Sequence, residues 1–179
     1  MRTAADFNSF YATPDPWRIS RARFRDKVLR RCLTPFVRGK SVLELGCGEG
    51  HLTQAVFGKA RSVVGIDISD VAIDRARSLD LPNARFESAD LLRTSFEGYD
   101  VIAAIECIYY LSLQERGEFL EKVATPEKCF CSRVRLSITD DISVISDWCT
   151  SLRRLDSLSS NFITCPFIGI RLHPESSPA

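Results

Sequence analysis

The sequence predicts an α/β fold in which helices cover both faces of a parallel β-sheet. Two observations lead to this prediction. Short apolar segments, typical of buried strands, alternate with segments of helical periodicity over most of the chain. The connections between them are short, as in strand–helix–strand units with parallel strands. The chain has 179 residues, of which 45% are hydrophobic and 26% charged, so we expect a single domain, residues 1–179, with a sizeable core.

The N-terminal part is expected to be an arm followed by a helix. Residues 1–16 are predicted to be irregular, because Pro14 and Pro16 disfavour a helix. A helix is predicted over residues 17–33, and Pro35 is expected to end it. The apolar residues that recur at helical intervals in this helix are Ile19, Phe24, Val28 and Cys32.

The central part alternates between strands and helices. Strands are predicted at residues 41–45, 62–66, 84–90 and 100–108. Helices are predicted at residues 51–60, at residues 70–79 and from residue 113 through Val123. Ser69 is a suitable N-cap for the second of these helices. Ser112 and Glu115 form a capping box before the third.

The last third of the chain is expected to be short or divergent for this fold. Strands are predicted at residues 128–138 and 161–172, but the first of them is polar for a central strand, with Arg133 and Arg135 in it. Between them lies a stripe of helical spacing, made of Ile142, Ile145, Trp148, Cys149 and Leu152.

The net charge of +1 hides an asymmetry. Residues 18–40 contain nine basic residues and one acid, Asp26, and so carry a charge of +8 against −7 for the remainder. This segment is either a face for nucleic acid or an anionic membrane, or a solvated helix face whose arginine stems cover apolar surface. The second interpretation is favoured, because the arginines are not interleaved with aromatic residues in the way that binding of single-stranded nucleic acid requires, and nucleic acid is not an expected partner.

The cysteines do not indicate a disulfide framework or a metal site. There are seven, which is an odd number, none forms a C-x-x-C pair, and the chain has only two histidines. No segment has the length and apolar character of a signal peptide or a membrane span. We therefore expect a cytoplasmic protein without a metal.

Three glycines and an acid follow the first predicted strand. The segment "VLELGCGEG" contains Glu44, Gly46, Gly48 and Gly50. Glycine allows a sharp turn and a close approach of a ligand to the backbone. A dinucleotide fingerprint would require a further glycine where His51 stands. A carboxylate at Glu44 would repel a pyrophosphate and would favour a ligand that carries a positive charge.

Acids also follow the other central strands. Asp67 follows the second strand, Asp90 the third and Glu106 the fourth. A carboxylate after the second strand can bind a ribose diol, and one after the third can bind an adenine amino group. Each acid alone could simply cap the next helix or bind loop amides. Because parallel strands end at one edge of the sheet, the joint pattern indicates a ligand site there.

These motifs together resemble the class I S-adenosylmethionine-dependent methyltransferases. The similarity lies in "VLELGCGEG", "VVGIDIS", "ARFESADLL" and "YDVIAAIECIYYL" and covers residues 38–125. The resemblance implies a Rossmann-like sheet with S-adenosylmethionine as cofactor and residues 38–125 as the cofactor-binding core. It implies a cofactor site made of Glu44, Gly46, Gly48, Asp67, Ile68, Asp90, Leu91 and Glu106.

Two further segments resemble the N-methyltransferases similar to nodulation protein S. These are "TPDPWRIS" before the fold and "ECIYYL" after the fourth strand. The resemblance implies that residues 1–34 cover the cofactor site, with Trp17 and Arg18 near the methionine end of the cofactor. An alternative for Trp17 is a hydrophobic contact with the first helix only.

The resemblance also implies a catalytic edge and a substrate class. Glu106 is expected to hold or deprotonate an amine of a small-molecule methyl acceptor, with Tyr109 and Tyr110 shaping the slot. The N/D-P-P-Y sequence of DNA-adenine and glutamine N-methyltransferases is lacking, which argues against those substrates. Two other classes stay open at this point: a pseudo-methyltransferase that binds the cofactor without catalysis, and an NAD-dependent oxidoreductase. The sequence does not identify the acceptor, the methylated atom or the oligomeric state.

Overall fold

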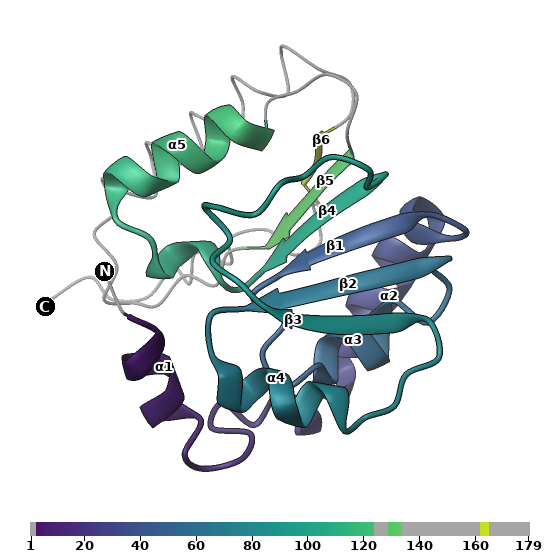
Figure 1. Cartoon of the computed structure of the whole chain (residues 1–179). Helices are drawn as coiled ribbons and strands as arrows, with labels where there is room; N and C mark the ends of the chain where they lie inside the picture. Colours follow the sequence, from purple (N-terminus) through teal and green to yellow (C-terminus); the bar gives the residue numbers. More distant parts are fainter. Residues whose placement is uncertain (1–2, 124–128, 134–161, 165–179) are drawn as a thin grey trace, which may run out of the picture.

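The chain folds around a six-stranded parallel sheet (Figure 1). The computed structural model describes residues 3–123, 129–133 and 162–164. The spatial order of the strands is β3-β2-β1-β4-β5-β6. They are β1 (Ser41–Leu45), β2 (Ser62–Asp67), β3 (Ala84–Ser88), β4 (Val101–Ile105), β5 (Cys129–Arg133) and β6 (Phe162–Thr164). The predicted α/β class with a parallel sheet is confirmed.

The helices follow the strands in the predicted alternation. Five are α-helices and two are short 3₁₀ helices within the described residues. They are α1 (Ala4–Phe10), η1 (Ile19–Arg21), α2 (Arg23–Val37), α3 (His51–Val56), α4 (Asp70–Arg77), η2 (Ile108–Tyr110) and α5 (Leu113–Val123). The carboxyl ends of the central strands point to the side of the sheet on which α1 lies (Figure 1).

Helices cover both faces of the sheet, as expected. On one face, Leu29, Leu33 and Val37 of α2 join residues of α3 and pack against Val42 and Val101. The opposite face is covered by a second cluster, which contains Phe119 of α5. This division follows from the period of two along a strand, which sends alternate side chains of β1 and β4 to opposite faces.

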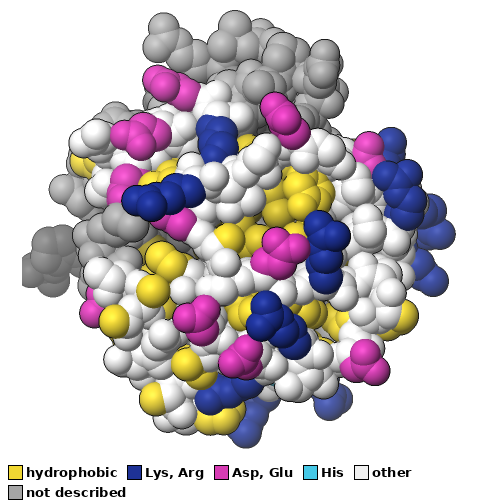
Figure 2. Space-filling view, viewed as in Figure 1, with side chains coloured by type: hydrophobic (Ala, Val, Ile, Leu, Met, Phe, Trp, Pro, Cys, Tyr) yellow, Lys and Arg dark blue, Asp and Glu magenta, His cyan; other side chains and the backbone are white. Residues whose placement is uncertain are grey.

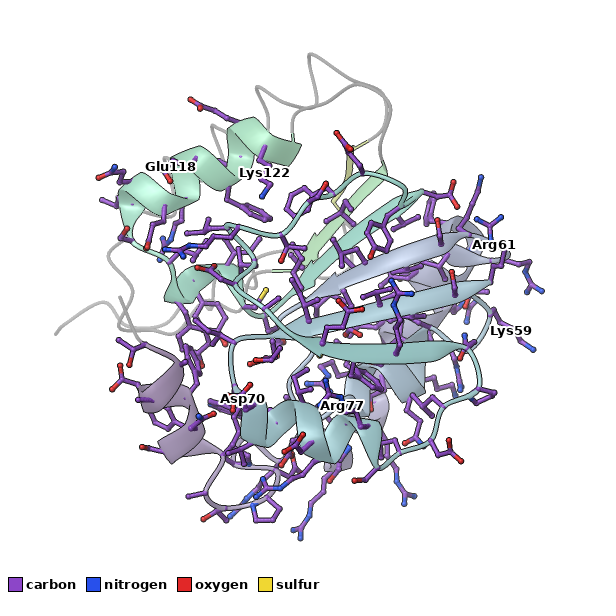
Figure 3. The ribbon with its side chains drawn as sticks, in the orientation of Figure 1. Lys59, Arg61, Asp70, Arg77, Glu118 and Lys122 are labelled. Atoms are coloured by element: carbon purple, nitrogen blue, oxygen red, sulfur yellow. The ribbon has the colours of Figure 1, made fainter. Side chains whose placement is uncertain are left out.

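An irregular segment after β3 completes the second face, where no regular helix lies between β3 and β4. Phe96 from this segment is buried and packs against Phe119 of α5 with ring centroids 6.1 Å apart. Lys122 of α5 donates a hydrogen bond to the Leu92 carbonyl at 2.8 Å, and its ammonium lies 4.6 Å from the Phe96 ring centroid (Figure 3). Figure 2 shows hydrophobic side chains gathered in a hollow on the viewed face, with charged side chains around it.

The predicted helix starts are confirmed. The Ser69 hydroxyl accepts a hydrogen bond from the Ala72 amide and caps α4. The Ser112 hydroxyl accepts from the Glu115 amide, and the Glu115 carboxylate accepts from the Ser112 amide at 2.8 Å. This reciprocal pairing is the capping box that opens α5.

The prediction of an irregular N-terminal arm is wrong for residues 4–10. These residues form α1, which begins with a capping box between Thr3 and Asp6. A proline restricts its own backbone and that of the residue before it. Pro14 and Pro16 therefore do not affect α1, which ends at Phe10. The sequence signal that reveals α1 is the T-x-x-D spacing of Thr3 and Asp6.

The predicted apolar stripe of the next helix is also wrong. Trp17 lies before the helix, and Phe24 is 83% exposed. The buried stripe of α2 is instead Leu29, Leu33 and Val37. Pro35 was expected to end the helix but lies inside α2, which ends at Val37. Val37 in this last turn is fully buried. The packing of that last turn outweighs the hydrogen bond that proline removes.

Several boundaries are shorter than predicted. The helix α3 ends at Val56, β3 ends at Ser88 and β4 ends at Ile105. The strand β5 forms within the predicted segment and pairs with β4. The expected helical stripe from Ile142 to Leu152 lies outside the described residues. Within the described part of the chain, no helix is long and apolar enough to cross a bilayer.

Candidate active site

A cavity of about 280 Å³ lies at the carboxyl edge of the sheet. Its walls come from the turns after β1, β2, β3 and β4, and from the N-terminal segment before α2. Ligands of open parallel sheets bind at this edge, because the strand ends and helix starts converge there. The cavity therefore lies where the sequence predicts a site.

The turn after β1 needs glycine at two positions. Gly46 has φ +67°, and a side chain on it would place Cβ 2.5 Å from Cβ of Cys107. Gly48 has φ +55°, and its Cβ would lie 2.5 Å from the Tyr11 hydroxyl oxygen. The glycines thus bring the backbone close both to the turn after β4 and to the N-terminal segment. Both line the cavity.

Asp67 at the end of β2 holds this glycine turn. One carboxylate oxygen accepts a hydrogen bond from the Gly48 amide at 2.9 Å, and the other accepts from the Ser69 amide at 2.9 Å. Burial raises the pKa of Asp67, while these backbone donors oppose the rise. Each oxygen keeps a further lone pair, so the carboxylate can accept two more hydrogen bonds from a ligand in the cavity.

The structure does not place Glu44 on the cavity wall. Its side chain is 1% exposed, and its carboxyl accepts a hydrogen bond from the Thr53 hydroxyl of α3. Burial raises the pKa of Glu44 from 4.5 to about 8, with a further rise from nearby Asp67. The expected fixed negative charge at Glu44 is therefore mostly absent near neutral pH, and direct contact with a ligand stays a prediction.

We expect Glu44 to make the protein less stable as the pH rises. The raised pKa favours the protonated carboxyl in the folded state, so its stabilisation is fully present below about pH 4.5 and is lost by about pH 8. The slope for one such group approaches about 1.4 kcal/mol per pH unit. Urea unfolding at pH 5, 6, 7 and 8 should show this decline in the wild type and a flatter profile in Glu44→Gln. The exposed variant Glu118→Gln is the control and should keep the slope of the wild type. If Glu44→Gln also showed the slope of the wild type, the raised pKa could not be assigned to Glu44.

The residues after β3 line the opposite part of the cavity. Asp90 and Leu91 both contribute to the wall, together with Ile68 from the turn after β2. The Asp90 carboxylate accepts a hydrogen bond from the Leu92 amide at 2.9 Å, which fixes its direction. This set offers apolar surface with one oriented acceptor, as the prediction of an adenine-binding region requires.

Glu106 lies directly after β4 and lines the cavity beside Tyr109 and Tyr110 of η2. Its φ of +58° is a left-handed conformation that is costly for a residue with a side chain. The two tyrosine rings lie 4.5 Å apart between centroids, and burial raises the pKa of Tyr109. The structure thus brings the three predicted catalytic residues to one wall.

The N-terminal segment closes the cavity with aromatic side chains. Tyr11, at the end of α1, is 6% exposed and packs edge-on against Trp17 with centroids 5.1 Å apart. Phe7 of α1 packs edge-on against Tyr110 at 5.1 Å. Trp17 and Arg18 both line the cavity, and Arg18 has φ +54°. Their place near the methionine end of the cofactor stays a prediction. Trp17 therefore does more than contact the following helix, because it also packs against Tyr11 and forms part of the cavity wall.

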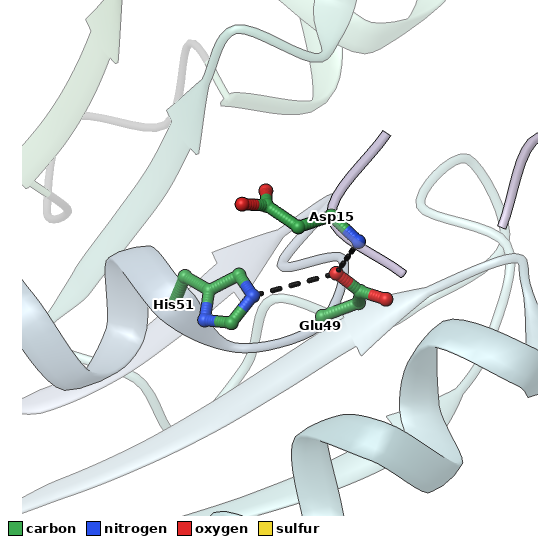
Figure 4. Close-up of side chains that lie close together, drawn as sticks. All are labelled: Asp15, Glu49 and His51. Atoms are coloured by element: carbon green, nitrogen blue, oxygen red, sulfur yellow. Dashed lines mark hydrogen bonds and ion pairs between the residues drawn. The ribbon is translucent and has the colours of Figure 1, made fainter. Parts of the chain in front are cut away.

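Glu49 connects this segment to the glycine turn (Figure 4). One of its oxygens accepts a hydrogen bond from the Asp15 amide at 2.8 Å and lies 3.4 Å from Nε2 of His51. The other accepts from the Arg75 guanidinium at 2.6 Å. Sequence reasoning missed this role because Glu49, Asp15 and Arg75 are far apart in the chain.

Asp15, Glu49 and His51 are residue types that bind metals, but their carboxylates already have hydrogen-bond and ion-pair partners within the protein. Asp15, Glu49 and His51 bring possible ligand atoms within 4.8 Å of one another. The Asp15 carboxylate, however, accepts hydrogen bonds from the Ile19 amide and the Ser20 hydroxyl. The Arg75 guanidinium supplies the positive charge beside Glu49. We therefore interpret the group as a clamp that holds the N-terminal segment.

We expect Glu49→Gln to loosen residues 8–20. The neutral amide loses the ion pair with Arg75 and offers one acceptor oxygen in place of two. Hydrogen exchange of amides in residues 8–20 should become about tenfold faster, which corresponds to about 1.4 kcal/mol of local opening. The control is Glu87→Gln, whose ion pair with Arg85 lies on the exposed edge of the sheet. Unchanged exchange in residues 8–20 would show that Glu49 does not act as a clamp.

Almost all of the predicted site residues meet in this one cavity, with Glu44 as the exception. Sequence reasoning also missed Tyr11, Glu49 and Arg25, which line it. For Arg25 a signal exists, because it lies four residues before Leu29 on the buried stripe of α2. Its side chain is 13% exposed, in contrast to the solvated arginines expected for this helix.

Residues 42–126 match the family model of a methyltransferase domain. This match spans slightly less than half of the chain, so the similarity to a methyltransferase domain is a property of residues 42–126. Over 107 residues this chain is 27% identical to nodulation protein S of Azorhizobium caulinodans, a match that covers 57% of this chain and 52% of that protein. Over 94 residues it is 37% identical to pavine N-methyltransferase of Thalictrum flavum, covering 49% of this chain and 26% of that one.

The methyltransferase fold is shared with solved structures. The crystal structure of the N-methyltransferase NodS from Bradyrhizobium japonicum, in complex with S-adenosyl-L-homocysteine, matches with a TM-score of 0.67. That match covers 87% of this chain and 86% of the other at 20% identity, which shows the common fold. The matches to the two curated relatives cover about half of one and a quarter of the other.

Proposed function

We propose that this methyltransferase transfers a methyl group from S-adenosylmethionine to an amine nitrogen of a small molecule. One observation carries the proposal. A single cavity brings the glycine turn, Asp67 and Asp90 to the same edge of the sheet as Glu106 and two tyrosines. The first set suits a nucleoside with a charged tail, and the second suits an amine that is to be methylated.

The residues present fit the cofactor. The Asp67 carboxylate has acceptor capacity for a ribose diol, and the turn at Gly46 and Gly48 leaves room beside the backbone. Asp90, with Ile68 and Leu91, would hold the adenine ring. The bound cofactor would supply an electrophilic methyl group. Arg18, which lines the cavity next to Trp17, would bind the carboxylate of its methionine part.

The other wall would position the acceptor. The Glu106 carboxylate would hold the amine and accept its proton, and the tyrosines would exclude water from the reacting atoms. The N-terminal segment covers the cavity with Phe7, Tyr11 and Trp17, which limits the space available to an acceptor. A small molecule therefore suits the site better than a macromolecule.

A cytoplasmic setting and a single functional domain are part of this proposal. Among the cysteines whose side chains the structure describes, Cys32, Cys47 and Cys107 are free thiols, which agrees with a reducing compartment. The N-terminal segment and the core share one cavity, so residues 1–34 and 38–125 would act as one unit.

Two measurements separate this function from the two alternatives. In calorimetry, the protein should bind S-adenosylhomocysteine and not NAD, and binding of NAD alone would indicate an oxidoreductase. Methyl transfer from labelled S-adenosylmethionine should then be measured with a panel of aliphatic and aromatic primary amines. Cofactor binding without transfer to any amine or hydroxyl compound would favour a pseudo-methyltransferase. Transfer to hydroxyl compounds alone would refute the amine assignment.

A further inference from the structure

Arg25 is the cation that faces Glu106. It lies on the buried stripe of α2, lines the cavity and has a side chain that is 13% exposed. Its Nη1 lies 3.6 Å from a carboxylate oxygen of Glu106, whose side chain is 12% exposed. A charge pair this shielded from water interacts more strongly than the same pair on the surface.

The guanidinium is held in this position from the other side. Its Nε and Nη2 donate to one carboxylate oxygen of Asp26 at 3.0 and 2.6 Å. Nη2 also lies 3.4 Å from the Ile19 carbonyl of η1, within hydrogen-bond reach. These contacts leave Nη1 directed toward Glu106, so Arg25 presents a fixed positive charge and not a mobile side chain.

We propose that Arg25 is a specificity-determining and positioning residue of the acceptor site, which makes Glu106 select the neutral amine over its charged form. This inference rests on the proposed function, because it requires an amine beside Glu106. A carboxylate by itself favours a protonated amine and raises the pKa of that amine. A guanidinium that shares the carboxylate opposes this effect and keeps more of the bound amine neutral.

Only the neutral amine can react. Glu106 accepts a proton from an amine that arrives protonated. The nitrogen lone pair then forms the new N–C bond, the sulfur keeps the electron pair of the S–C bond that breaks, and the methylated product carries the positive charge. Arg25 also disfavours the charged product beside Glu106, which would aid its release. The same residue would thus favour the reactive form and weaken binding of the methylated form.

Other charged groups act on the same pair and must be considered in the test. From α2, Asp26 reduces the field of Arg25, and from η2 the two tyrosines lie beside Glu106. The remaining titratable or charged residues that line the cavity are Tyr11, Asp15, Arg18, Cys47, Glu49, His51, Asp67, Asp90 and Cys107. None of these changes when Arg25 is replaced, so a comparison of variants isolates its effect.

The first test is the pH dependence of single-turnover methyl transfer with the most active primary amine of the panel, at saturating concentration. In Arg25→Gln the bound amine should have a higher pKa, so the acidic limb of the profile should move up by about one pH unit. The rate below that limb should fall about tenfold and the rate above it should change little. Arg25→Lys keeps the charge and should keep the limb near its wild-type position. The control Arg30→Gln removes an exposed cation of the same helix.

The second test measures binding of tetramethylammonium, which cannot lose a charge, to the protein with bound S-adenosylhomocysteine. Arg25→Gln should bind it about tenfold more tightly than the wild type. The role of Arg25 would be overturned if the acidic limb did not move in Arg25→Gln, or if it moved equally in Arg25→Lys. It would also be overturned if Arg25→Gln and the wild type bound tetramethylammonium with equal affinity. Methyl transfer by the wild type to no amine would instead overturn the proposed function, and this inference with it.

Discussion

Replacement of Glu106 by Gln is expected to lower the single-turnover rate of methyl transfer about 100-fold or more while cofactor affinity stays close to that of the wild type. The carboxylate lies at the cavity wall beside Tyr109 and Tyr110, where an amine would have to release its proton. The amide has nearly the same shape but cannot accept that proton. The loss should shrink at high pH, where the amine arrives already neutral.

Two readouts on the same variant decide between a catalytic and a binding role for Glu106. If Glu106 mainly holds the ammonium of the cofactor, affinity for S-adenosylmethionine and the transfer rate should fall in parallel. Calorimetry gives the first quantity and rapid-quench measurements with labelled cofactor give the second. Glu118→Gln is a matched control, because Glu118 is exposed on α5 and does not line the cavity (Figure 3).

Replacement of Asp67 by Asn is expected to weaken cofactor binding about tenfold to a hundredfold. Its oxygens already accept hydrogen bonds from the Gly48 and Ser69 amides, and the proposed ribose contacts would use the remaining lone pairs. The amide retains one acceptor oxygen, so charge-assisted hydrogen bonds of about 1.5–3 kcal/mol are lost. Asp67→Ala should lose more, because it also releases the glycine turn.

The control for Asp67 is Asp74→Asn on the exposed side of α4, where the carboxylate pairs only with Arg77 among the described residues. Calorimetric titration with S-adenosylhomocysteine gives the affinity of each variant. Circular dichroism and a melting curve establish that the sheet is intact. A folded Asp67→Asn protein with wild-type affinity would rule out a ribose contact at this residue.

Much of the fold and of the site could be predicted because the signals are local. Apolar strands and helical segments alternate along the chain, and the right-handed connection of parallel strands then places consecutive strand ends at one edge. Gly46, Asp67, Asp90 and Glu106 each follow a strand directly. Their convergence in one cavity is therefore implied by the order of the elements.

The errors in α2 have a common cause, which is that its buried face was inferred from the sequence pattern alone. The run of arginines in α2 indicated a solvated face, and Arg23, Arg30 and Arg31 are exposed, but the Arg25 side chain is only 13% exposed and Phe24 is 83% exposed. Which face of a helix is buried depends on the rotation of the helix against the sheet, and several periodic stripes in one sequence can compete. The helix α2 continues past Pro35 because its last turn buries Val37 against the sheet.

The sequence by itself determined the class of the fold, the glycine turn and the acids at the strand ends, because local patterns and chain connectivity specify them. Only the tertiary structure decided that Glu44 is buried with a raised pKa, that Glu49 clamps Asp15 and that Arg25 faces Glu106. These features depend on distances between elements far apart in the chain and on the exclusion of water between packed layers. Both arise only when the layers assemble, so no pattern within a single segment encodes them.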